Sequence, residues 1–372
     1  MFSMRRCGAF PLLLALTALL TGCLGGGSNV YSVTGTVIEV DTGNPLWGAS
    51  VAVGSRQTAT NARGEFELKR VPAGSHTLSV TLDGYKPENC ALNVSRDTAV
   101  SVELESPLPP FWNGSVCFEW YDTVDYSWAP AYDGATLGSL MVSYWAWTDE
   151  VLDMGRSRGE ITRVIAVVNG EPFEGVVDAE DITMLGNIPL AVGSNTVQIR
   201  IWDDKGSART SKPFTFTADV DNFDLRVLLT WDTLDDLDLC IFFRDPGEPN
   251  TFDPSIRDVH HISWSNPYPD FGLEAGKNPF YELGSSARGP ESIIFPQLIP
   301  GDYHIWIEPV NASGIKAKTR IFLNAETSKP SEIVETELAA EGPTYVITVR
   351  VAENGTVTVE PVPPVPQDVV EE

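Results

Sequence analysis

The sequence predicts an all-β protein made of tandem β-sandwich domains. Between residues 31 and 360, short runs of alternating apolar and polar residues recur, separated by turn-forming Gly, Asn, Asp and Pro. Such runs are typical of strands in sandwiches. We find no long run with the 3.6-residue period of an amphipathic helix. With 372 residues the chain has room for two or three domains, each with its own core.

The first 22 residues are predicted to be a secretory signal. Arg5 and Arg6 form a positive segment, and an apolar run of about a dozen residues follows, which is too short to span a bilayer. The stretch Leu20-Thr21-Gly22-Cys23 then resembles the lipobox of bacterial lipoprotein precursors. The resemblance implies cleavage before Cys23 and attachment of diacylglycerol to its sulfur. A plain secretory signal with a chance cysteine is the alternative.

A lipid on Cys23 would make the membrane the first partner of this protein. Leu24 follows the cysteine where an aspartate would retain the protein in the inner membrane of enteric-type bacteria. We therefore expect a lipid-anchored protein of the cell envelope, in the outer membrane. The glycine-rich residues 23–30 are predicted to be a flexible tether.

The charge balance excludes one class of partner. The chain has 25 basic and 51 acidic residues and a net charge of −26, which becomes −28 when Arg5 and Arg6 leave with the leader. Such a surface repels nucleic acid and anionic lipid headgroups, so we expect no nucleic-acid partner. It suits a cation, a basic partner, or solubility alone.

Residues 31–106 form the first predicted domain. Six strands are expected there: Ser32–Val40, Ser50–Val53, Gln57–Thr60, Glu65–Leu68, His76–Leu82 and Ala99–Leu104. Phe66 and Leu68 should face the core, and Gly64 should permit a tight turn.

An ordered series of motifs in this domain resembles the carboxypeptidase regulatory-like domain. The motifs are Gly35–Val37, Pro45–Val51, Thr60–Phe66, Val71–Leu78 and Gly84-Tyr85. The resemblance implies a transthyretin-like Greek-key sandwich that serves as a rigid spacer or adhesion module and does no chemistry.

Residues 107–220 form the second predicted domain, after the proline-rich linker Ser106–Pro110. Its strands are expected at Ile161–Val168, Ile188–Leu190, Asn195–Trp202 and Pro213–Ala218. The segment Gly193–Ile201, followed by Asp203 and Gly206, is similar to the last hairpin of bacterial surface Ig-like domains. The first half is rich in aromatic residues, which are either core material or an exposed platform for sugars. These residues are Trp112, Trp120, Tyr121, Tyr126, Trp128, Tyr132, Tyr144, Trp145 and Trp147.

Residues 221–360 form the third predicted domain, and residues 361–372 a disordered acidic, proline-rich tail. Its motifs are Trp231-Asp232, Asp236–Ile241, Arg244–Gly247, His260–Ile262, Arg288–Ile293 and Pro300–Ile307. In this order they resemble the YfaP-like family of exported bacterial proteins, a β-rich domain of uncharacterised function. The family usually has an aspartate before the Gly-Pro-Glu turn, whereas Glu282 is the nearest preceding acid here.

Four acids in the third domain form a candidate metal site. Along Asp236–Ile241 the residues alternate, so Asp236 and Asp238 should share one face while Leu237 and Leu239 point to the core. Together with Asp232 and Asp235 they offer the hard oxygen ligands that suit Ca²⁺. A solvated acidic face is the alternative, and we expect no other cofactor.

Three cysteines remain after Cys7 and Cys23 are assigned to the leader and the anchor. Cys90 and Cys117 could form a bridge across the first domain boundary, and Cys240 should be a buried thiol.

The sequence contains no catalytic constellation that we recognise. Gly155–Gly159 has the spacing of a nucleophile elbow but lacks the strand and helix that this motif needs. The four histidines have no zinc-peptidase spacing. We therefore predict a non-catalytic surface or periplasmic module for binding or adhesion, with a protein or glycan ligand. The alternatives are a carbohydrate-binding protein that uses the aromatic residues of the second domain, and an unrecognised hydrolase.

Overall fold

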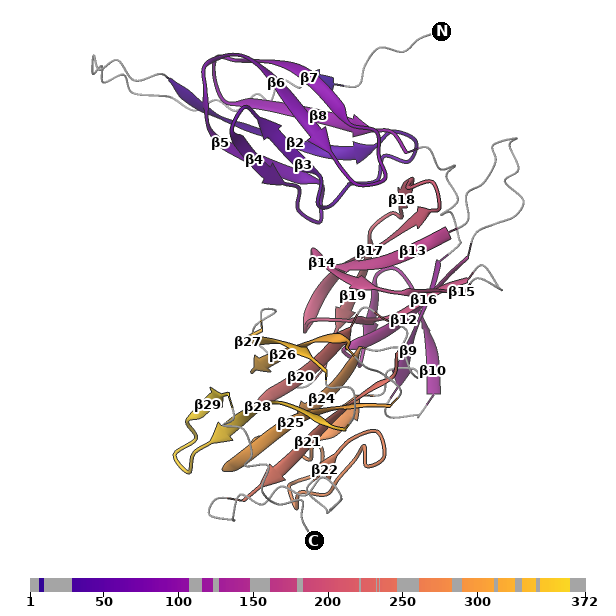
Figure 1. The fold of residues 1–372 in the computed structure, drawn as a ribbon, viewed down its shortest axis with the longest axis vertical. Coiled ribbons are helices and arrows are strands. Elements are labelled where there is room, and N and C mark those ends of the chain that lie inside the picture. The colour runs from indigo at the N-terminus through magenta and orange to yellow at the C-terminus, as the bar shows by residue number, and fades with distance from the viewer. Residues whose placement is uncertain are drawn as a thin grey trace.

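The computed structural model describes residues 7–9, 29–106, 116–122, 127–147, 161–178, 183–220, 222–231, 233, 235–245, 261–282, 290–310, 314–324, 330–338 and 342–361. Every regular element in these ranges is a β-strand, and six sheets pair as three consecutive sandwiches (Figure 1). The predicted fold class is confirmed. No helix in the described ranges is long and apolar enough to span a membrane.

The first sandwich packs the sheet β1-β8-β2-β5 against the sheet β4-β3-β6-β7. Its strands are β1 (Cys7–Ala9), β2 (Val30–Glu39), β3 (Ser50–Val53), β4 (Arg56–Ala59), β5 (Glu65–Pro72), β6 (Gly74–Thr81), β7 (Glu88–Val94) and β8 (Thr98–Leu104). Phe66 and Leu68 lie in the core, as predicted. Gly64 has φ of 70°, and a Cβ there would lie 2.5 Å from the carbonyl oxygen of Val37, so only glycine fits.

Two strands of the first sandwich differ from the prediction. β7 was not predicted, although Cys90, Leu92 and Val94 alternate into the core, because its other residues have low strand propensity. β1 lies within the predicted leader and pairs antiparallel with β8, with Cys7 opposite Val102. Cys23 and the tether up to residue 28 lie outside the described residues.

The second sandwich pairs the sheet β10-β9-β12-β16-β15 with the sheet β11-β19-β17-β13-β14, to which β18 adds along β17. The first sheet contains β9 (Val116–Asp122), β10 (Ser127–Ala131), β12 (Met141–Trp147), β15 (Val176–Asp178) and β16 (Thr183–Pro189). The second contains β11 (Ala135–Leu137), β13 (Ile161–Val168), β14 (Glu171–Glu174), β17 (Gly193–Asp203), β18 (Ala208–Thr210) and β19 (Phe214–Ala218).

The aromatic residues of the second domain divide between core and surface. Tyr144 is buried against Phe118, whereas Tyr132 is 71% exposed and Trp145 44% exposed. The other six aromatic residues of the predicted platform, Trp112, Trp120, Tyr121, Tyr126, Trp128 and Trp147, lie outside the side chains that the structure describes.

The third sandwich packs the sheet β23-β24-β20-β26-β27 against the sheet β22-β21-β25-β28-β29. The first sheet contains β20 (Leu225–Trp231), β23 (Phe280–Glu282), β24 (Glu291–Phe295), β26 (Lys316–Leu323) and β27 (Glu332–Glu337). The second contains β21 (Leu237–Arg244), β22 (His261–Ile262), β25 (Gly301–Pro309), β28 (Thr344–Val351) and β29 (Val357–Glu360). Leu237, Leu239 and Ile241 are fully buried, which confirms the predicted alternation along β21.

The first two domains are joined by a shared core and a buried polar network. Ile165, Val167 and Trp202 of the second domain pack into the core of the first. Arg209 Nη1 lies 3.1 Å from Glu39 Oε2, and the Tyr85 hydroxyl donates to Glu39 Oε1 at 3.0 Å. The two sandwiches therefore meet at a packed interface.

The cysteines do not form the bridge that the sequence left open. Cys117 is an exposed free thiol, and Cys90 is disulfide-bonded, so these two residues are not partners. Cys240 is buried and forms no disulfide, as predicted.

Candidate binding site

A buried arginine connects the second and third domains. Arg226 on β20 donates through Nη1 to the carbonyl oxygen of Leu190 at 2.6 Å and through Nη2 to that of Leu140 at 3.2 Å. Its Nε donates to Ser292 Oγ at 3.0 Å. A buried guanidinium needs hydrogen-bond acceptors in place of water. Because two of the acceptors of Arg226 are carbonyl groups of the second domain, this side chain links the third domain to the second.

Glu282 completes this interdomain contact. Its Oε1 accepts hydrogen bonds from Ser139 Oγ at 2.9 Å and from the backbone N–H of Leu140 at 2.6 Å, and its Oε2 lies 3.5 Å from Arg226 Nη2. Both side chains are almost completely buried. Glu282 thus helps to fix the orientation of the second and third domains.

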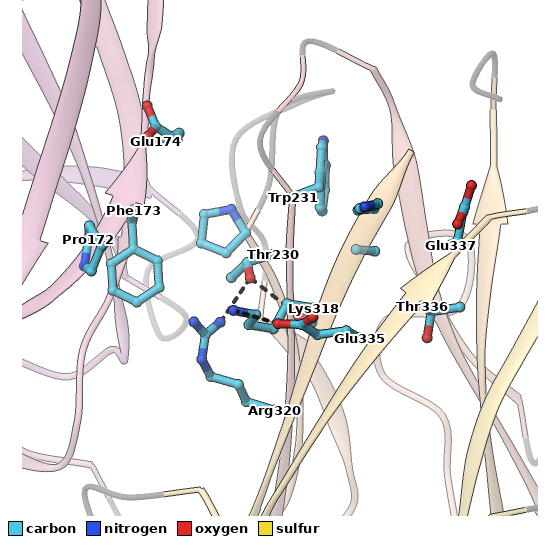
Figure 2. A pocket seen from close by; sticks show the side chains of 13 residues that line it. Pro172, Phe173, Glu174, Thr230, Trp231, Lys318, Arg320, Glu335, Thr336 and Glu337 are labelled. Carbon is cyan, nitrogen blue, oxygen red and sulfur yellow. Dashed lines mark hydrogen bonds and ion pairs between the residues drawn. The ribbon is translucent and has the colours of Figure 1, made fainter. Parts of the chain in front are cut away.

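A groove of about 430 Å³ opens beside this junction. Phe173 and Glu174 of β14 form one wall, and Thr230, Trp231 and the paired strands β26 and β27 form the other (Figure 2). The volume lies within the range of ligand pockets, which are about 300 to 1,000 Å³. Because its walls come from two domains, the groove exists only when both domains are held together.

Rows of opposite charge line the third-domain wall. Lys316, Lys318 and Arg320 occupy alternate positions of β26 and share one face. In the antiparallel register Glu337 lies opposite Lys316 and Glu335 opposite Lys318. Lys318 Nζ lies 3.1 Å from Glu335 Oε1 (Figure 2). Hydrogen-bond donors and acceptors therefore stand side by side along the groove.

Two aromatic rings of the groove are held in place by their neighbours. The indole N–H of Trp231 donates to the carbonyl oxygen of Asp235 at 2.8 Å. The Arg320 guanidinium lies 5.4 Å from the centre of the Phe173 ring, and its Nη1 donates to Thr230 Oγ1 at 2.8 Å. Rings held in this way are preorganised, so that packing a ligand against them would cost little side-chain entropy.

A second hollow of about 250 Å³ continues from the first along the same domain junction. The two share Phe173 and Arg320. The second hollow is lined by apolar side chains of both domains, among them Val192, Phe322 and Ile333.

None of these groove residues was predicted from the sequence. A signal was present in the alternating Lys316, Lys318 and Arg320, an unusual row of cations in so acidic a chain. Phe173, whose ring lies against Arg320, comes from another domain, and no local sequence pattern connects the two residues.

The predicted calcium ligands are only partly described. Asp232 lies outside the described residues, and the carbonyl of Asp235 positions Trp231. Asp236 and Asp238 are half-buried, and both carboxylates raise the pKa of the neighbouring Glu291. Among the described residues, no three His, Cys, Asp or Glu side chains are grouped to hold a metal ion. The calcium site therefore stays a prediction that depends on Asp232.

Glu291 is the most strongly perturbed acid of this region. Burial is the main cause that raises its pKa to about 8. Hydrogen bonds from the Tyr281 hydroxyl and the Leu239 N–H act in the opposite direction, because they favour the charged carboxylate. The Leu239 N–H lies 2.6 Å from Glu291 Oε2. At neutral pH the carboxyl group is thus largely protonated and serves as a half-buried link between β24 and β21.

The described histidines serve packing and hydrogen bonding. His261 is buried and stacks on Phe242 with 4.5 Å between ring centres. His304 Nδ1 lies 2.8 Å from Thr348 Oγ1, and burial lowers its pKa to about 4. His76 Nε2 lies 2.8 Å from the Pro72 carbonyl oxygen. His260 and the segment Gly155–Gly159, which has the spacing of a nucleophile elbow, lie outside the described residues.

Several solved structures of bacterial proteins have some similarity to this chain. A type II cohesin–X-dockerin complex from Acetivibrio cellulolyticus is 22% identical over 20% of this chain and 56% of its own, with a TM-score of 0.19. A second mutant of that complex is matched over 59% of its length, so this chain spans just over half of both. The Bacteroides ovatus protein SGBP-B, solved with a mixed-linkage heptasaccharide, is 10% identical over 84% of this chain and 67% of its own, with a TM-score of 0.18. The major pilin subunit of Bacillus cereus is 11% identical over 88% and 97%, with a TM-score of 0.20.

Comparison with curated proteins yields no significant match. The family model of the carboxypeptidase regulatory-like domain matches residues 32–105. The match confirms what the motifs of the first domain predicted, and it covers the sandwich formed by β2 to β8.

Proposed function

We propose that this protein is a non-catalytic binding or adhesion module of the bacterial cell envelope, attached to the outer membrane through a lipid on Cys23. In this proposal its ligand occupies the groove between β14 and the paired strands β26 and β27. The first domain and the tether hold that groove away from the membrane surface.

The observation that supports the binding role is a preformed groove between two domains. Arg226 and Glu282 hold both walls in a fixed relation, and Trp231 and Phe173 are held by hydrogen-bond and cation–π partners. A ligand that enters such a groove orders few side chains, which lowers the entropic cost of binding.

The non-catalytic assignment rests on the chemistry of the groove. Its carboxylates face cations, as Glu335 faces Lys318 and Glu174 pairs with Arg163. No nucleophile with a neighbouring general base lines the described groove. The lipid anchor rests on the lipobox sequence alone.

The test is a binding screen with detergent-solubilised full-length protein against soluble polysaccharides and purified matrix proteins. Phe173→Ala and Trp231→Ala should each weaken the binding of any ligand found at least tenfold, since each removes a large contact surface. Trp264→Ala is the matched control, because Trp264 is exposed and does not line the groove. Binding that all three variants retain would place the ligand elsewhere.

A further inference from the structure

The groove has features that select among ligand classes. We propose that it takes an uncharged, polyhydroxylated ligand, namely a segment of a neutral polysaccharide. The inference rests on the proposed function, because it names the ligand of the same site.

The first argument is charge. The groove carries three cations, Lys316, Lys318 and Arg320, and three carboxylates, Glu174, Glu335 and Glu337. A polyanion placed along β26 would approach Glu335 and Glu337, and a polycation would approach Lys316 and Lys318. Because Lys316 and Lys318 each lie opposite a glutamate across the strand pair, either ion would gain an attraction and a repulsion of similar size.

The second argument is hydrogen bonding. A sugar hydroxyl group both donates and accepts, so adjacent hydroxyls can accept from Lys318 and donate to Glu335 at the same place. Hydrogen bonds to charged groups are stronger than those between neutral groups. The ion pair of 3.1 Å already orients both side chains before binding.

The third argument is the pair of aromatic rings. A pyranose has flat C–H faces that pack against an aromatic ring, and Trp231 and Phe173 supply one ring on each wall of the groove (Figure 2). Trp231 is fixed by its bond to Asp235 and Phe173 by Arg320. The groove thus offers aromatic rings for the apolar C–H faces of the sugars and charged side chains for their hydroxyl groups.

The experiment measures Kd by calorimetry for full-length protein in detergent, at 50 and 500 mM NaCl. The probes are a neutral glucan, xylan, mannan and galactan, with polygalacturonate and polylysine as the charged counterparts. We expect at least one neutral polysaccharide to bind with a Kd that changes less than twofold between the two salt concentrations, because screening acts on charged ligands. Phe173→Ala and Trp231→Ala should weaken that binding at least tenfold, and Trp264→Ala should leave it unchanged.

Two further variants distinguish the ligand classes. Lys318→Gln and Glu335→Gln should both weaken binding of a neutral polysaccharide, about three- to tenfold, since it uses a donor and an acceptor. An anionic ligand would be weakened by Lys318→Gln and strengthened by Glu335→Gln, and a cationic ligand would show the reverse.

The outcomes also distinguish this inference from the proposed function. If only a charged probe or a matrix protein binds, and Phe173→Ala abolishes that binding, the groove is the binding site and the neutral-polysaccharide inference is wrong. If every ligand found binds the Phe173→Ala and Trp231→Ala variants as tightly as the wild type, the proposed function of the groove is wrong as well.

Discussion

Glu39 of the first domain and Arg209 of the second form an ion pair of 3.1 Å in which neither side chain reaches solvent. Arg209 Nη2 also lies 3.3 Å from Asp41, while its Nε and Nη1 make no aligned hydrogen bond to any described atom. The attraction between Glu39 and Arg209 is therefore mainly electrostatic. It links the first domain to the second, which carries one wall of the groove.

Glu39→Gln should destabilise the protein by about 3 kcal/mol, because it leaves the buried Arg209 guanidinium without its main counter-charge. Denaturation in urea measures the loss. Glu67→Gln is the control: its pair with Lys69 is exposed, and its removal should change stability by less than about 1 kcal/mol. Equal stability of the two variants would show that the buried pair does not hold the junction.

Glu291→Gln should change how stability depends on pH. The pKa of Glu291 is about 8 in the folded protein and near 4.5 in the unfolded chain. Between these two pH values the carboxyl group is ionised in the unfolded chain but protonated in the folded protein. The contribution of Glu291 to the free energy of unfolding is therefore fully present below pH 4.5 and falls by about 1.4 kcal/mol for each pH unit up to about 8.

Glutamine imitates the protonated carboxyl group and removes this loss. Relative to the wild type, Glu291→Gln should be of similar stability at pH 4.5 and more stable at pH 8, as urea midpoints at the two pH values would reveal. A difference between the two proteins that is the same at both pH values would contradict the raised pKa.

Calcium should raise the melting temperature of full-length protein by a few degrees if Asp232, Asp235, Asp236 and Asp238 bind it. With ~2 mM Ca²⁺ and a dissociation constant of ~0.3 mM, mass action gives about 1.2 kcal/mol. The shift should be absent in chelator and in the Asp236→Asn, Asp238→Asn double variant. The Glu65→Gln, Glu67→Gln double variant removes two acids from one face of β5 and should keep the shift. Identical wild-type curves with calcium and with chelator would refute the site.

Cys23→Ala should abolish incorporation of radiolabelled palmitate, because the thiol is the proposed site of acylation, and should remove the protein from the outer-membrane fraction. Cys117→Ala, which removes an exposed free thiol, should keep both the label and the location. Label that persists after Cys23→Ala would exclude the anchor.

The sequence by itself determined the fold class and much of the strand pattern. Alternation along Asp236–Ile241 predicted which side chains of β21 are buried, and Ile161–Val168 was predicted with the bounds that β13 has. These features could be predicted because a strand exposes successive side chains to opposite faces, a rule that acts over a few residues.

Only the tertiary structure decided how the domains meet and where a ligand can enter. Glu39 and Arg209, Glu282 and Leu140, and Phe173 and Arg320 come from different domains and far-separated parts of the chain. Alternation with a period of two residues shows which side chains share a face of a strand. It does not show which strand of another domain packs against that face. The groove depends on that packing, because its two walls belong to different sandwiches. Buried polar contacts hold these sandwiches together at their junction, and Ile294 of the third domain also packs into the core of the second.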